Sequence, residues 1–112
     1  MAQTHSSFAE FWPFYLQEHA KPTTRMLHYI GTTLVVLLAI AAIFTGEWLL
    51  LLALPLAGYF FAWVAHFAVE KNRPATFTYP LWSLAADFRM WWLWLTGRIG
   101  PELRKAGVGS SR

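Results

Sequence analysis

Two long apolar runs constrain this chain more than any other feature of its sequence. The first is YIGTTLVVLLAIAAIF at residues 29–44, and the second is WLLLLALPLAGYFFAWVAHFAV at residues 48–69. Neither run contains Asp, Glu, Lys or Arg, and each is close to the ~20 residues that cross a hydrocarbon core as a helix. Only TGE separates them. The pattern predicts a helical hairpin in a membrane, with spans at residues 26–44 and 48–70.

The composition fits one small membrane domain covering residues 1–112. The chain is 56% hydrophobic and 13% charged, whereas soluble domains are roughly half apolar and about a quarter charged. The sequence has no cysteine, which excludes disulfides and thiolate metal ligands. The nine Lys and Arg are scattered along the chain, so no basic stripe for nucleic acid is expected.

Two further helices are expected to flank the hairpin. Residues 6–20 carry aromatic side chains at helical spacing after a serine that can cap a helix, which predicts an interfacial helix. Residues 80–97 begin with a proline and end with a glycine, but Asp87 and Arg89 in their middle would be costly at the bilayer centre. We therefore expect an amphipathic helix that is interfacial or partly inserted. The polar, glycine-rich residues 98–112 are expected to fray.

The basic residues predict the orientation of the hairpin. Lys21 and Arg25 precede it and Lys71 and Arg73 follow it, while the connecting TGE has no basic residue. By the positive-inside rule, both termini should be cytoplasmic. The expected location is an integral position in a membrane, the inner (plasma) membrane for a bacterial protein, and the lipid bilayer is the expected partner. The sequence does not decide whether the protein forms a homo-oligomer.

Three histidines are expected to meet at one end of the hairpin. His28 lies 19 residues before Glu47 at the hairpin tip and His66 lies 19 residues after it, so both are about 28 Å from the tip at ~1.5 Å per residue. His19 can fold back to the same place through the turn-forming KPTT. Glu70 is four residues after His66, which is one turn of an α-helix.

Each histidine also has a structural interpretation, as an interfacial residue, a helix-start residue or a polar pair inside a bundle. Taken together they favour a metal site, because ionisable residues within a span are functional candidates by default. Imidazoles with a carboxylate are ligands for zinc, iron or copper.

A second polar cluster follows the second span. Lys71 and Arg73 are either plain positive-inside anchors or contacts for an anionic head group. Asp87 and Arg89 are candidates to pair with Arg73 or Glu70, or to orient a metal-binding imidazole from behind. Spacing alone does not choose among these roles.

The motifs FYLQEHAKPTTRMLHYIGT and AWVAHFAVEKNRPATF, with the apolar hairpin between them, resemble the small Mpo-like membrane proteins. YPLWSLAADFRMW resembles their bacterial-type branch. The resemblance implies an iron(II)-dependent dioxygenase that shortens 2-hydroxy fatty acids by one carbon. It implies that His19, His28 and His66 are the functional histidines, and that Glu70 matches the motif glutamate.

The leading interpretation is therefore an all-α membrane protein that acts as a lipid oxygenase. Iron(II) would be held by the three histidines, with Glu70 as a fourth ligand or general base and with Lys71 or Arg73 on the substrate carboxylate. One alternative is a non-catalytic membrane protein that binds lipid or assists assembly and has structural histidines. Another is a zinc hydrolase, which would use similar ligands without consuming oxygen.

Overall fold

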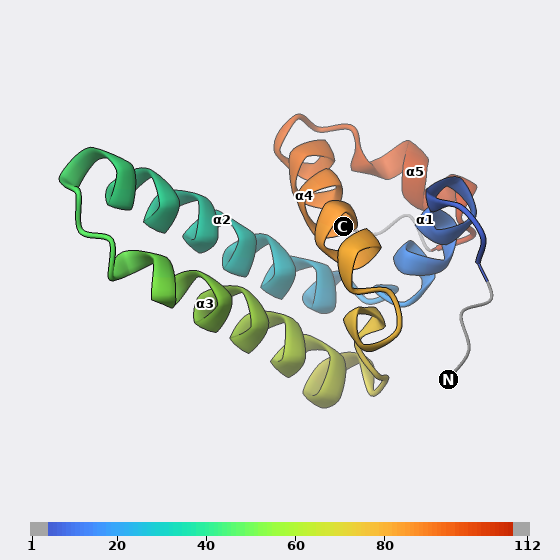
Figure 1. Cartoon of the computed structure of the whole chain (residues 1–112). Coiled ribbons are helices and arrows are strands. Elements are labelled where there is room, and N and C mark those ends of the chain that lie inside the picture. The colour runs from blue at the N-terminus through green and yellow to red at the C-terminus, as the bar shows by residue number, and fades with distance from the viewer. Residues whose placement is uncertain (1–4, 109–112) are drawn as a thin grey trace.

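Every regular element in the computed structural model, which describes residues 5–108, is helical. In chain order these are α1 (Phe8–Gln17), α2 (Pro22–Thr45), α3 (Leu50–Val64), the π-helix η1 (Ala65–Glu70), the 3₁₀ helix η2 (Ala75–Phe77), α4 (Pro80–Leu95) and α5 (Ile99–Lys105). The predicted all-α fold is confirmed for this part of the chain. Helices α2 and α3 form a long pair, and α1, α4 and α5 gather at one end of it (Figure 1).

The hairpin is defined by its helix ends and by small residues at its seam. Helix α2 begins at Pro22, whose fixed φ suits the first helical position, and ends at Gly46 with φ of 73°. A Cβ added to Gly31 would lie 3.0 Å from the Cβ of Phe61. Because glycine has no side chain, α2 and α3 approach each other closely here, as helices in membranes commonly do.

The outer surface of the hairpin is apolar and exposed. Two helical stretches, Pro22–Thr45 and Leu50–Glu70, are long and apolar enough to cross a membrane, and only 28% and 11% of their most apolar windows are buried. Phe44 is 84% exposed and Leu56 is 73% exposed. The core helices of a soluble protein would bury such residues. The surface is therefore the kind that lipid covers, and insertion into a bilayer remains the prediction made from the sequence.

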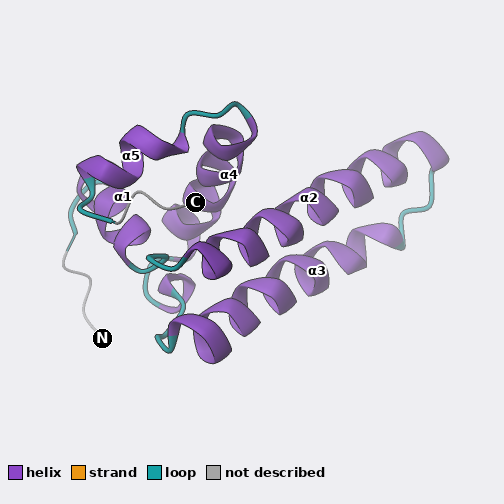
Figure 2. Ribbon diagram, turned by 180° about the vertical axis from the view of Figure 1, so that it is seen from behind, coloured by secondary structure: helices purple, strands orange, loops and turns teal. Residues whose placement is uncertain are grey.

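The largest buried apolar core lies beside the hairpin, where α1, α4 and α5 pack together (Figure 2). Trp12 on α1 donates a hydrogen bond from Nε1 to Glu102 on α5, at 2.9 Å. We call this three-helix unit the cap. Its most deeply buried side chains, all at most 2% exposed, are Phe11, Tyr15, Leu16, Ala86, Met90 and Leu103.

The structure corrects the expected fraying after α4. Residues 99–105 form α5, because Ile99 and Leu103 lie four positions apart on one helical face and bury against the cap. Residues 109–112 of the expected tail lie outside the described part of the chain. The expected helices at 6–20 and 80–97 are present in shorter form, as α1 after the capping residue Ser7 and as α4 before Gly97.

Candidate metal centre

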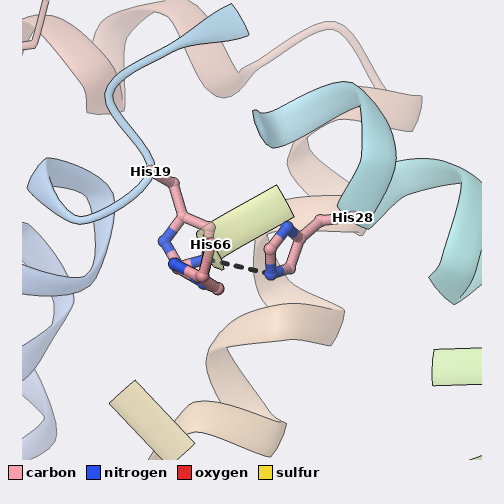
Figure 3. Close-up of side chains that lie close together, drawn as sticks. All are labelled: His19, His28 and His66. Carbon is pink, nitrogen blue, oxygen red and sulfur yellow. Dashed lines mark hydrogen bonds between the residues drawn. The ribbon is translucent and has the colours of Figure 1, made fainter. Parts of the chain in front are cut away.

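Three buried histidines from three different segments meet at the junction between the hairpin and the cap. His19 lies in the turn between α1 and α2, His28 lies near the start of α2, and His66 lies in η1. The Nε2 atom of His19 is 3.1 Å from that of His28 and 3.0 Å from that of His66. Each side chain is at most 5% exposed. Figure 3 shows the three rings converging, so the predicted meeting of these histidines is confirmed.

The other ring nitrogen of each histidine has a hydrogen-bond acceptor. The Nδ1 of His19 is 2.6 Å from the carbonyl oxygen of Tyr15, and the Nδ1 of His28 is 3.0 Å from that of Thr24. A carbonyl oxygen can only accept, so both Nδ1 atoms must carry the proton. The Nε2 atoms of these two rings are then left with free lone pairs.

His66 is oriented by a side chain instead of a carbonyl. Its Nδ1 is 2.7 Å from Oδ1 of Asn72. The amide nitrogen of Asn72 donates to the carbonyl oxygen of Glu18 at 3.0 Å and to the Glu18 carboxylate at 3.2 Å. Because these two acceptors hold the amide nitrogen, the amide oxygen faces His66, and Nδ1 of His66 carries the proton.

Three unprotonated Nε2 atoms therefore face one another, and none of the three rings has a proton there to share. A bound cation would satisfy all three lone pairs. Two nitrogens that are each about 2.1 Å from one ion and about 90° apart lie about 3.0 Å from each other, which matches the observed separations of 3.0 and 3.1 Å. Held Nδ1 atoms are also the usual arrangement behind metal-binding histidines. The three histidines thus fit a metal ion.

The surroundings of His19 keep its ring neutral and fix its position. Burial lowers its pKa well below the ordinary histidine value, and the neighbouring His28 and His66 lower it further. The ring is therefore neutral at neutral pH, and neutral imidazole is the form that ligates metals. The guanidinium of the buried Arg25 donates from Nη1 to the carbonyl oxygens of His19 and Ala20, at 2.9 Å each. These two bonds fix the turn that carries His19.

Asp87 lies behind His19 and is linked to it through Tyr15. The Tyr15 hydroxyl donates a hydrogen bond to the Asp87 carboxylate, and the Tyr15 ring lies 4.1 Å from the His19 ring between centroids. Burial raises the pKa of Asp87 to about 6. No hydrogen bond joins Asp87 to any of the three histidines, so its role in orienting a metal-binding imidazole stays a prediction. The same role stays a prediction for Arg89, whose guanidinium lies over the Trp12 ring, 4.6 Å from the centroid.

The remaining predicted site residues lie outside the histidine group. The Glu70 carboxylate accepts hydrogen bonds from the backbone N–H of Lys21 at 3.0 Å and from Oγ1 of Thr24 at 2.6 Å. The Glu70 carboxylate therefore caps the N-terminus of α2. Lys71 is exposed, with φ of 65°, and the exposed Arg73 stacks on Phe77 at 5.1 Å.

Four residues around the histidines were missed or misjudged from the sequence alone. No site role was predicted for Tyr15, Asn72 or Ser83, and Arg25 was predicted only as a basic residue that precedes the hairpin. An asparagine six residues after a histidine and an arginine six residues after another are the only local signals. Their partners depend on the tertiary fold.

Two neighbouring cavities, which share the lining residues His28 and Asp87, open beside the histidines. The smaller, of about 20 Å³, is lined by residues that include the three histidines, Ser83 and Asp87. The larger, of about 300 Å³, begins at His28 and Asp87 and extends between α2, α3 and α4 as far as Leu54 and Pro55. The second cavity is lined mainly by apolar side chains. A small chamber that contains polar side chains thus lies next to a longer apolar one.

Comparison with known proteins gives one match. The family model described as "2-hydroxy-palmitic acid dioxygenase Mpo1-like" matches residues 5–99, which include all three histidines, Asn72 and the cap helix α4. Searches of curated proteins and of solved structures each found no match.

Proposed function

The chain belongs to the Mpo1-like family, and from this premise we propose that it is a metal-dependent dioxygenase that shortens 2-hydroxy fatty acids by one carbon at a membrane interface. The observation that carries the proposal is the convergence of three Nε2 lone pairs from His19, His28 and His66. We propose iron(II) as the metal, because imidazole ligands suit iron and because non-haem iron supplies the chemistry of dioxygen.

The residues of the chain position the substrate and the ligands. Oxygen atoms of Tyr15, Thr24 and Asn72 accept the three Nδ1 protons, so the Nε2 lone pairs point toward one common position. The apolar cavity between α2, α3 and α4 suits an acyl chain. The small chamber beside the histidines suits the polar end of the same molecule. The two cavities together therefore match an amphiphile with one polar end.

Three roles predicted for charged residues stay predictions. The catalytic role of Glu70 and the contacts of Lys71 and Arg73 with a substrate carboxylate draw no support from the cavities, because none of the three lines either cavity. Zinc stays a less favoured alternative metal.

The first test is metal content. We expect protein purified in detergent without oxygen to bind one iron per chain, and His28→Ala and His66→Ala to lose it. His5→Ala should keep it, because the His5 ring packs on Phe14, at 4.7 Å between centroids, outside the histidine group. Circular dichroism checks that each variant is folded. Normal iron content in folded His28→Ala and His66→Ala proteins would contradict the metal centre.

The second test measures the proposed reaction. Iron-loaded protein should consume oxygen with 2-hydroxyhexadecanoic acid and release an acid one carbon shorter, detected by mass spectrometry, whereas hexadecanoic acid should be inert. Zinc-loaded protein should be inactive with both. If iron-loaded, folded protein consumes no oxygen with 2-hydroxy acids of any chain length, the proposed reaction is wrong and lipid binding becomes the better account.

A further inference from the structure

A buried serine lies in the polar chamber without a hydrogen-bond partner. Ser83 on α4 is 4% exposed, and its Oγ makes no hydrogen bond to any described residue. It lines the same small cavity as the three histidines. Buried hydroxyls are almost always hydrogen-bonded in folded proteins. The unused hydroxyl therefore indicates a partner that enters this cavity.

The three histidines and Asp87 already have hydrogen-bond partners in this chamber. Each histidine has its Nδ1 bonded to an acceptor, and one oxygen of Asp87 accepts from the Tyr15 hydroxyl. Tyr59 and Thr76 also carry hydroxyls at this cavity, but neither is buried. Ser83 is therefore the buried hydroxyl without a partner beside the histidines. Asp87 keeps a second carboxylate oxygen that can accept a hydrogen bond.

Ser83 and Asp87 are four residues apart on α4, so they lie one turn apart on the same face of the helix. Ser83 lines only the small cavity, Asp87 lines both, and Leu84 and Phe88 line only the large one. From the small cavity to the large one, the residues of α4 thus change from a hydroxyl donor to a carboxylate acceptor and then to apolar side chains. A 2-hydroxy acid has a complementary order of carboxylate, hydroxyl and alkyl chain.

We propose that Ser83 donates a hydrogen bond to the carboxylate of the substrate, while Asp87 accepts one from its 2-hydroxyl and the alkyl chain enters the large cavity. This inference rests on the proposed function and assigns the direction in which the substrate lies. The reverse direction would place the substrate carboxylate against the Asp87 carboxylate, where like charges repel. In this assignment Ser83 contacts the substrate carboxylate in place of Lys71 and Arg73, which line neither cavity.

The test measures binding without turnover. Metal-loaded protein in detergent is titrated without oxygen with 2-hydroxyhexadecanoic acid or with hexadecanoic acid, and binding is followed by tryptophan fluorescence, since Trp63 lines the small cavity. Ser83→Ala should weaken the binding of both acids by about tenfold, because both carry the carboxylate. Ser83→Thr, which keeps the hydroxyl, should bind within about threefold of the wild-type protein.

Two comparisons keep the result specific. Ser6→Ala removes an exposed serine hydroxyl that contacts Glu10 outside both cavities and should bind like the wild-type protein. Asp87→Asn can still accept the hydrogen bond from the Tyr15 hydroxyl. It should weaken the binding of the 2-hydroxy acid more than the binding of hexadecanoic acid. Wild-type affinity in Ser83→Ala, or an equal loss in Ser83→Ala and Ser83→Thr, would overturn the assignment.

The outcomes also separate this inference from the proposed function. If the wild-type protein binds the 2-hydroxy acid and Ser83→Ala binds it equally well, only the assignment of Ser83 fails. If the serine variants behave as expected but the wild-type protein consumes no oxygen, only the dioxygenase reaction fails. If the wild-type protein binds neither acid, both fail.

Discussion

At the residue scale, the three histidines were predictable from the sequence, but the groups that orient their rings were not. Equal spacing from Glu47 placed His28 and His66 at one level, and the turn before α2 allowed His19 to reach them. The protonated nitrogen of each ring depends on an acceptor supplied by the fold. For His66 that acceptor is Asn72, whose own orientation is set by Glu18 from a distant segment. No periodicity in the sequence reports such a contact.

The role of Asn72 can be tested by removing its acceptor. We expect Asn72→Ala to weaken zinc binding, used as a redox-inert probe of the three histidines, by about 10 to 100-fold. Without the Asn72 oxygen, the His66 ring can rotate or take the other tautomer. Competition with a chelator measures the affinity, and His5→Ala is the control for a substitution away from the site. An affinity equal to that of the wild-type protein would mean that His66 is oriented by something else.

At the element scale, the π-helix η1 was not predicted, and Glu70 at its end is not one of the residues that meet with the histidines. The prediction counted α-helical turns, which would put His66 and Glu70 on one face. Residues 65–70 instead form i to i+5 hydrogen bonds and turn less per residue. Glu70 lies at the start of α2, where it accepts a hydrogen bond from Thr24. Single π-helical turns are frequent at functional sites, but apolar periodicity does not reveal them.

This contact separates a structural role of Glu70 from a catalytic one. Glu70→Ala and Thr24→Val each break the same 2.6 Å hydrogen bond, so both should lower the free energy of unfolding by about 1 kcal/mol. Thermal unfolding in detergent, followed by circular dichroism, measures the loss. If Glu70 is also the general base, only the Glu70 variant should lose turnover when both proteins are iron-loaded and folded. Equal turnover in the two variants would mean that Glu70 only caps α2 and has no catalytic role.

At the scale of the whole molecule, the histidines lie where the hairpin meets the cap. Two long apolar helices and two flanking helices could be predicted, because apolar runs and helix-end residues are local signals. The cap could not, since α5 is polar in composition and is held by its contacts with α1 and α4. The cap closes one end of the hairpin, and the large cavity runs from the histidines along the hairpin toward Leu54. A substrate chain in that cavity would lie along the two spans.

The arrangement predicts the topology, which can be read with single cysteines because the native chain has none. Helices α1 and α5 contact each other through Trp12 and Glu102, so Ser6 and Arg104 should lie on the same side of the membrane. Thr45, at the far end of α2, should lie on the opposite side. By the positive-inside rule, the basic residues that flank the hairpin predict that the cap side is cytoplasmic. In right-side-out vesicles, a membrane-impermeant maleimide should therefore label Thr45→Cys and leave Ser6→Cys and Arg104→Cys unlabelled until detergent is added. Labelling of positions 6 and 104 from opposite faces would require an odd number of spans, and α4 would then have to cross the bilayer despite Asp87 and Arg89.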